Sequence, residues 1–496
     1  MKKEKIIRTI NVIIIIIIVI CGAFVTSIYS KRFTPSSSSK INLNFNMNNW
    51  CYDSTNDVYY QLGASYCSKP KDIELEKFDI YVPGQYLIGK KNNDGTYKCN
   101  INKKGEKSGL NAKTAPIIIG IEAKETLIQR TKETYNYEDI SDYIKEGYIY
   151  IWPGMRGLKD NKKAESNEEY SNAILDGVTD LKALVRFCRF NGKLLPGNIE
   201  KIIAYGINGG GTKSAILGSS GDSELYSSKL FTIGAIMQDN DGKTISDSVN
   251  GTMCCSPTNN IEISEKAYAW SIEQYLDNNN KEQKERSKEL AIQYGNYINN
   301  MKFKSEEGTL LELDEMKEGL FTGGTYYNYI KSEGEKSVNG FLKNTVFPYA
   351  DTERNITFET PKDYIEYLNS NRKWIEYNVE NNIIEIISLK EYANFCRDNK
   401  TLNEYNISLN EYNPYYYLSD KYNGINSSYI SRYWNICILL DDNCNNFLPE
   451  ENLKLILQKN EDAKRIDYTC MWTKNYNNEQ KKEIAFNNLK DWIKRY

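Results

Sequence analysis

The segment formed by residues 201–217 constrains the fold of this chain more than any other. It reads KIIAYGINGGGTKSAIL, an apolar run typical of a buried strand, then a tight glycine turn, then a helical pattern. Similar short apolar runs at residues 78–82, 116–121 and 148–152 alternate with helical patterns such as residues 173–191. Strands that alternate with helices predict an α/β fold with a doubly wound, mostly parallel sheet.

Helical periodicity and composition predict the organisation of the rest of the body. Within residues 173–191 the spacing predicts that three charged side chains face solvent: Asp180, Lys182 and Arg186. Residues 276–410 have looser patterns with polar helical stretches and Gly- and Asn-rich connections, which predict an inserted cap or lid. The strand and helix rhythm returns at residues 434–440, and a helix is predicted at 479–495.

The N-terminus has the pattern of an export signal. Four basic residues within the first eight positions precede an apolar run over residues 10–29. A transmembrane helix needs about 20 apolar residues, whereas the core of a signal peptide has about 7–15. Residues 1–30 therefore predict a single membrane anchor with the amino end in the cytoplasm and the body outside. Cleavage after Ser27, which gives a secreted protein, is the alternative. A Ser-rich stalk (31–49) and the body (50–496) follow.

Charge and cysteine content limit the partners of the chain. The net charge is -3, with basic and acidic residues spread along the sequence, so we expect no nucleic-acid partner. The chain has 11 cysteines, all but Cys21 in the predicted body. In an exported protein they permit disulfides, without indicating the pairing. Their spacing forms no recognisable zinc site, so we expect no metal and no cofactor.

The chain has no histidine among its 496 residues. Imidazole is the usual general base near neutral pH and the commonest metal ligand. Any mechanism that depends on a Ser-His-acid or Cys-His arrangement is therefore excluded.

The turn within residues 201–217 reads Gly206-Ile207-Asn208-Gly209-Gly210, and we call these five residues the elbow. In α/β-hydrolases the motif G-x-S-x-G lies between a strand and a helix, and its strained turn exposes the serine hydroxyl. Asn208 occupies the position of that serine. Asparagine tolerates positive φ, so the elbow keeps its shape but has no hydroxyl.

Further blocks of sequence surround the elbow, and they are Phe78-Asp79-Ile80-Tyr81-Val82-Pro83, Glu146-Gly147-Tyr148-Ile149-Tyr150, Gly154-Met155-Arg156-Gly157, Asp180-Leu181-Lys182-Ala183, Leu195-Pro196-Gly197-Asn198, Ser220-Gly221-Asp222, Ala267-Tyr268-Ala269-Trp270, Asn413-Pro414-Tyr415 and Trp434-Asn435-Ile436. Together and in this order they resemble the bacterial subtype of tannases and related feruloyl esterases, over about residues 55–496. The resemblance implies an α/β-hydrolase fold and descent from enzymes that hydrolyse galloyl or feruloyl esters.

The resemblance also implies where the family's catalytic groups fall. The serine falls on Asn208, and the amide of Gly209 becomes an oxyanion-hole donor with a partner amide from the loop after Ile119. The triad aspartate falls on Asp442, or equally on the neighbouring Asp441.

The family's remaining functional groups fall near the C-terminus and in the cap. The histidine falls on Tyr476 or Asn475. A lysine and a glutamate that bind the phenolic hydroxyls correspond to Lys373 and Glu391, and a further acid of the pocket is replaced by Cys444. Two of the three triad groups are therefore absent.

The loss of one triad member lowers turnover by about a million-fold. The sequence therefore favours an exported, catalytically inactive protein that binds a phenolic or carbohydrate-linked ester or acts as a scaffold. One alternative is a residual or unconventional carboxylesterase for phenolic esters, which would use an aspartate formed by deamidation of Asn208 or a pair of Lys213 and Ser214. The other is a nucleotide-binding loop, because residues 206–214 nearly match G-x-x-x-x-G-K-[ST].

Overall fold

The computed structural model describes residues 41–123, 126–159, 165–257, 261–275, 281–315, 321–351, 355–370, 372–395, 413–440, 447–473 and 476–495. The predicted N-terminal anchor, residues 1–30, lies outside these ranges. Within them, no helix combines the length and the apolar character needed to cross a membrane. The chain from Leu43 to Tyr496 forms one unit, and the fold below is the fold of that unit.

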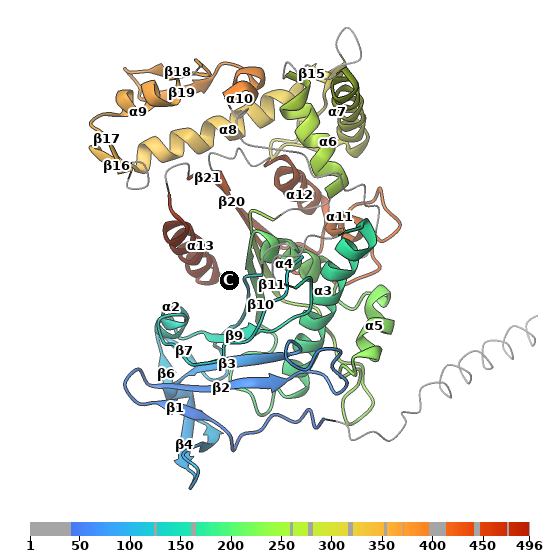
Figure 1. The fold of residues 1–496 in the computed structure, drawn as a ribbon, viewed down its shortest axis with the longest axis vertical. Coiled ribbons are helices and arrows are strands. Elements are labelled where there is room, and N and C mark those ends of the chain that lie inside the picture. Colours follow the sequence, from blue (N-terminus) through green and yellow to red (C-terminus); the bar gives the residue numbers. More distant parts are fainter. Residues whose placement is uncertain are drawn as a thin grey trace, which may run out of the picture. The chain divides into compact units, whose positions relative to one another are not determined.

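A nine-stranded mixed sheet forms the centre of this unit (Figure 1). Its strands lie in the spatial order β1 (Cys51–Asp53), β2 (Val58–Ser65), β3 (Lys77–Pro83), β9 (Ile149–Pro153), β8 (Ile117–Ile121), β10 (Ile202–Ile207), β11 (Gly251–Cys255), β20 (Tyr433–Leu440) and β21 (Arg465–Trp472). The strands from β9 to β21 in this order run parallel, whereas β1, β2 and β3 pair in antiparallel fashion.

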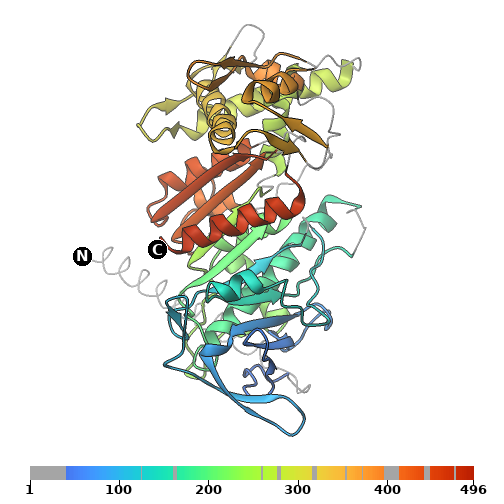
Figure 2. The ribbon, with the colours of Figure 1, turned by 90° about the vertical axis from the view of Figure 1, so that its left-hand side faces the viewer.

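Helices cover both faces of the sheet, as a doubly wound fold requires (Figure 2). They are α2 (Ser141–Lys145), α3 (Asn167–Phe190), α4 (Gly209–Ser219), α5 (Ser227–Thr232), α12 (Leu448–Lys459) and α13 (Asn478–Ile493). The buried side chains of β8 alternate between the faces: Ile117 and Ile119 pack with α3 and α4, and Ile118 packs with α2 and α13. This burial on two sides explains the continuous apolar strands and confirms the predicted α/β fold.

A long segment joins β11 to β20 and includes residues 276–410, for which the sequence predicts a cap. We call this segment the cap region, or cap. Its helices are α6 (Ile261–Ser271), α7 (Lys281–Met301), α8 (Thr325–Asn344), α9 (Pro361–Leu368), α10 (Leu389–Phe395) and α11 (Pro414–Leu418). Four small hairpins join them: β12 (Phe303–Lys304) with β13 (Leu310–Leu311), β14 (Asp314–Glu315) with β15 (Phe321–Gly323), β16 (Tyr349–Asp351) with β17 (Ile356–Phe358), and β18 (Ile375–Asn378) with β19 (Ile383–Ile386). Two further pairs lie near the N-terminus: β4 (Leu87–Lys91) with β5 (Tyr97–Ile101), and β6 (Glu106–Lys107) with β7 (Leu110–Asn111).

The structure contradicts the predicted outward orientation of the charged residues of α3. Asp180 and Lys182 are fully buried and Arg186 is 4% exposed. Lys182 Nζ donates to Asp247 Oδ1 at 2.8 Å, and Arg186 Nη2 donates to Asp247 Oδ2 at 2.5 Å. Asp180 accepts from Arg156 Nη2 at 2.7 Å. Each buried charge is compensated by a partner from another part of the chain, and residues 177–188 of α3 are enclosed on all sides.

The predicted disulfides are also not present among the described cysteines. Eight cysteines fall within the described ranges, and all are free thiols: Cys51, Cys67, Cys99, Cys188, Cys254, Cys255, Cys437 and Cys470. Six of them are buried, where a thiol behaves as a small apolar side chain. The structure therefore corrects the prediction for these residues. Cys396 and Cys444 lie outside the described ranges.

A buried carboxyl group joins the cap to the sheet. Glu451 of α12 is fully buried. Tyr329 of α8 donates to its Oε2 at 2.8 Å, and Tyr468 of β21 donates to its Oε1. Lys454 Nζ lies 3.8 Å from Oε2 of Glu451 and 3.9 Å from Oε2 of Glu333, which belongs to α8. Burial raises the pKa of Glu451 to about 7.

We expect Asp247→Asn to lower the free energy of unfolding by about 3–5 kcal/mol, because two buried cations lose their counter-charge. Equilibrium urea denaturation measures the change. The matched control is Glu366→Gln, which removes an exposed partner of Lys362 and should change the free energy by no more than about 0.5 kcal/mol. A loss as small for Asp247→Asn as for the control would contradict a stabilising role for this carboxylate.

We further expect Glu451→Gln to flatten the pH dependence of stability. The folded protein holds the Glu451 proton more tightly than the unfolded chain does, so the stability contribution of Glu451 is complete below the ordinary pKa of 4.5 and is lost as the pH rises to about 7. Because glutamine does not titrate, the variant should lose about 3 kcal/mol less than the wild type across this window. Urea denaturation at pH 4.5 and pH 7.5 tests this; identical pH slopes would refute it.

Candidate functional site

The elbow lies at the carboxyl edge of the sheet, between β10 and α4. Asn208 follows the last residue of β10 and precedes Gly209, the first residue of α4. Its backbone has φ 51° and ψ -120°, a sparsely populated conformation for a residue with a side chain. The Asn208 N–H donates to the carbonyl of Cys255 at 2.8 Å, and its side chain is exposed to solvent. The turn is therefore sharp and strained, and it presents position 208 outward.

Two glycines allow three backbone segments to meet at this turn. A Cβ on Gly206 would lie 2.2 Å from the carbonyl oxygen of Gly210. A Cβ on Gly210 would lie 1.8 Å from the carbonyl oxygen of Ile121, at the end of β8. Any side chain at either position would force the strand and the helix apart.

The first turn of α4 provides backbone donors at the elbow. The first intrahelical hydrogen bond runs from the Thr212 N–H to the Asn208 carbonyl at 3.0 Å. The amides of Gly209, Gly210 and Gly211 therefore have no intrahelical partner. The positive end of the helix dipole adds to their field, so this end of α4 is suited to a carbonyl oxygen or an anion.

The side chain of Gln129 accepts hydrogen bonds from the backbone amides that follow β8. The N–H groups of Glu122 and Ala123 both donate to Gln129 Oε1 at 2.8 Å. The side-chain amide of Gln129 donates in turn to the carbonyls of Gly120 and Pro153, at 3.0 and 2.8 Å. The partner amide predicted from the loop after Ile119 is thus already engaged at these two positions. No motif in the sequence marks Gln129, because its role depends on contacts between separate strands.

Glu122 directly follows β8, and its backbone lies close to the elbow. Its backbone nitrogen would lie 3.4 Å from a Cβ on Gly210. The side chain remains exposed, but surrounding atoms raise its pKa, while Lys482 and Lys132 oppose this effect. This residue was also not identified from the sequence.

The structure describes only part of the predicted triad. Tyr476 follows β21 and is half-buried, with its ring centroid 6.4 Å from that of Phe341 in α8. No hydrogen bond joins the side chains of Tyr476 and Asn208, both of which are described. Asp442 and Asp441 lie outside the described residues, as do Asn475 and Cys444, so their positions remain predictions.

The two residues predicted to bind a phenolic ring lie in the cap and are engaged elsewhere. Lys373 Nζ lies 3.0 Å from Glu376 Oε1. Glu391 Oε2 accepts from Arg372 Nε at 2.6 Å. The structure therefore does not pair Lys373 with Glu391, and their role as ligand contacts remains a prediction.

The environment of Lys213 and Ser214 argues against the two alternatives that use them. Lys213 is fully buried, and its Cε would lie 3.0 Å from a Cβ on Gly177 of α3. Ser214 is also fully buried, with its Oγ 2.7 Å from a Cβ placed on Gly206. Neither side chain is presented to solvent at the turn, where a nucleotide phosphate or an ester would bind.

Comparison with known proteins identifies the fold. No protein-family model matches this sequence, and no curated protein matches it. Among solved structures, the Fusobacterium nucleatum tannase is similar with a TM-score of 0.63 and 20% sequence identity, over 90% of this chain and 99% of that chain. The native tannin acyl hydrolase from Lactobacillus plantarum is similar with a TM-score of 0.61 and 19% identity, over 90% and 98% of the two chains.

A third solved structure, a tannin acyl hydrolase in complex with 3,4-dihydroxybenzoate, has a TM-score of 0.62 and 18% identity, over 88% of this chain and 94% of that chain. The similarity extends over nearly the full length of each neighbour. At these identities it shows that the chain has a tannase-like hydrolase fold, in agreement with the resemblance seen in the sequence.

We expect Gly210→Ala to lower the free energy of unfolding by about 1–3 kcal/mol, because the new methyl group overlaps the Ile121 carbonyl. Thermal and urea denaturation measure this loss. The matched control is Gly340→Ala in α8, where a Cβ meets no atom within 4 Å, and it should stabilise the protein by up to about 1 kcal/mol. Equal effects of the two substitutions would show that the elbow is not closely packed.

Proposed function

We propose that this protein is a catalytically inactive relative of the tannin acyl hydrolases that binds its ligand without cleaving it. Its N-terminal segment anchors it in the membrane with the body outside the cell, or directs its secretion if the segment is cleaved. The ligand is a phenolic or carbohydrate-linked ester, or the acid derived from one. Nucleic acid is not among its partners.

The observation that carries this proposal is Asn208 at the elbow of a chain that has no histidine. A carboxamide does not attack an ester carbonyl as a serine alkoxide does, and no imidazole is present to accept and return the proton. Gln129 supports the same conclusion, because its Oε1 already accepts from the backbone amides of Glu122 and Ala123, which the resemblance offers as partners in an oxyanion hole.

The choice of ligand rests on the solved neighbours and on the elbow of this chain. Tannin acyl hydrolases have been solved in complex with 3,4-dihydroxybenzoate and with ethyl gallate. In this chain the amides at the start of α4 remain suited to a carboxylate or an ester carbonyl. Binding at the elbow therefore needs no nucleophile.

A residual esterase is the second candidate, and the observation that favours it is the exposed Asn208, which is followed by a glycine. Loss of ammonia from Asn208 followed by addition of water would give an aspartate at the elbow. Its carboxylate could displace the alcohol of an ester once, but no base remains to direct water onto the resulting anhydride. A mass spectrum of the peptide that contains Asn208 decides whether this aspartate forms.

We expect the purified full-length protein in detergent to hydrolyse methyl gallate, methyl ferulate and p-nitrophenyl acetate no faster than a heat-denatured control. Loss of a triad member lowers turnover by about a million-fold, so any residual hydrolytic activity falls below detection. Asn208→Ser should remain inactive, because it restores the hydroxyl without a base. Titration calorimetry should show that the wild type binds 3,4-dihydroxybenzoate. Saturable hydrolysis by the folded wild type would disprove inactivity, and absence of binding would disprove the ligand class.

A further inference from the structure

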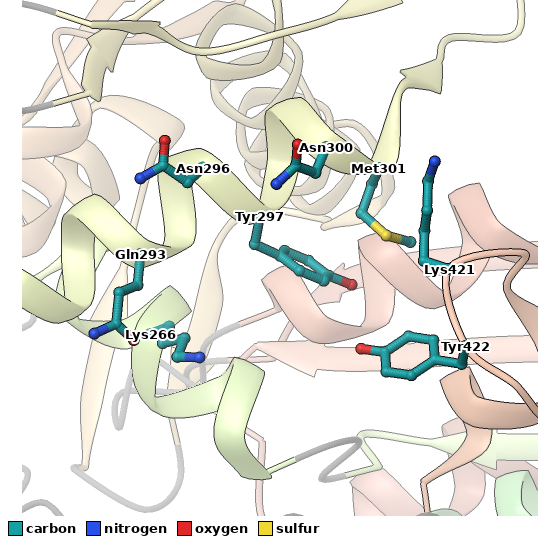
Figure 3. Close-up of a pocket in the computed structure, with 8 residues that line it drawn as sticks. All are labelled: Lys266, Gln293, Asn296, Tyr297, Asn300, Met301, Lys421 and Tyr422. Carbon is teal, nitrogen blue, oxygen red and sulfur yellow. The ribbon is translucent and has the colours of Figure 1, made fainter.

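A surface pocket with a volume of about 610 Å³ lies between α6, the C-terminal part of α7 and the segment after α11 (Figure 3). Its size is within the range of about 300–1,000 Å³ that small ligands occupy. The residues that line it include Lys266 of α6, Tyr297 and Met301 of α7, and Lys421 and Tyr422 of the following segment. None of the residues assigned to the elbow or the triad lines this pocket, so it is a second candidate site.

The charged residues that line the described part of this pocket are both lysines, Lys266 and Lys421. A third lysine, Lys459, donates from its Nζ to the carbonyl of Met301 at 2.7 Å. Burial lowers the pKa of Lys459, and the positive charges of Lys421 and Lys304 lower it further, against the opposing effect of Asp420. Lys266 and Lys421 thus bring two positive charges to the lining, which favours an anionic ligand, and Asp420 beside Lys421 offsets part of this charge.

Two tyrosines give the pocket aromatic surface, and the hydroxyl of Tyr297 is itself buried. In Figure 3 the side chains of Tyr297 and Tyr422 extend into the pocket from opposite sides, with their hydroxyl groups directed toward one another. Tyrosine combines an apolar ring with a hydroxyl that both donates and accepts hydrogen bonds. Asn296 and Asn300, one turn apart on α7, add amide donors and acceptors. Such a lining suits a ring that has apolar faces and several hydroxyl groups.

The end of α7 limits the charge of the ligand. Met301 is the last residue of α7, so the negative end of the helix dipole faces this pocket. The site also has no arginine among its lining residues in the described chain, and so lacks the planar fork that binds phosphate through two parallel hydrogen bonds. A singly charged carboxylate fits this combination better than a phosphate dianion.

We propose that this pocket binds an acidic carbohydrate, namely a sugar unit that carries a carboxylate. Lys266 and Lys421 neutralise the carboxylate, Tyr422 and Tyr297 contact the faces of the sugar ring, and the amides of α7 bind its hydroxyl groups. This inference does not depend on the elbow, so its failure would leave the proposed function intact.

The test uses the full-length protein and a trimer of galacturonic acid, with the methyl-esterified trimer as the uncharged comparison ligand. Titration calorimetry at low ionic strength should detect saturable binding of the acid trimer, and binding should weaken as NaCl is added. The methyl ester should bind at least about five-fold more weakly, because it keeps the hydroxyls and ring faces but loses its charge.

Substitutions of residues that line the pocket test whether the trimer binds there. Lys421→Gln and Lys266→Gln should each weaken binding by about two- to five-fold, and Tyr422→Leu should weaken it more than Tyr422→Phe, which keeps the ring. Lys362→Gln, at an exposed lysine of α9, is the control and should bind as the wild type does. Circular dichroism and thermal denaturation confirm that each variant is folded.

Three results would overturn the proposal. They are absence of acid-trimer binding to the wild type, equal binding of the esterified trimer, and unchanged binding by both lysine variants. Saturable binding of inorganic phosphate with the same lysine dependence, without binding of the trimer, would overturn it as well, because the site would then recognise any small anion.

Discussion

The close packing of three backbone segments at the elbow is the constraint on which the rest of the site depends. Gly206 and Gly210 bring the end of β10 and the start of α4 within contact of the Ile121 carbonyl. This packing holds Asn208 in its strained conformation at the start of α4, whose first amides have no intrahelical partner. The shape of the elbow therefore depends on its glycines more than on the residue at its centre.

Buried charges hold the elements behind the elbow. Lys182 of α3 donates to the Ser220 carbonyl at the C-terminal end of α4 as well as to Asp247. One ammonium group thus ties α3, α4 and the segment before β11 together. Because a buried charge is tolerated only with its partners in place, these contacts specify one arrangement of helices on this face of the sheet.

The sequence predicted the features that depend on neighbouring residues and missed those that depend on distant ones. The strand at residues 116–121 and the turn at Asn208 follow from local patterns and were found. The burial of Asp180 and Arg186 was predicted wrongly, because their partners lie 24 and 61 residues away along the chain. Gln129 was missed for the same reason, since its carboxamide bridges β8 and the end of β9.

Helices of the cap region contact the end of β21, where Trp472 and Tyr476 lie. Trp472 Nε1 donates to the hydroxyl of Tyr364 in α9 at 2.8 Å, and the ring of Tyr476 packs near Phe341 of α8. The region in which the family resemblance places a histidine is therefore part of the packing between cap and sheet. The contacts of Trp472 and Tyr476 thus tie the end of β21 to α9 and α8.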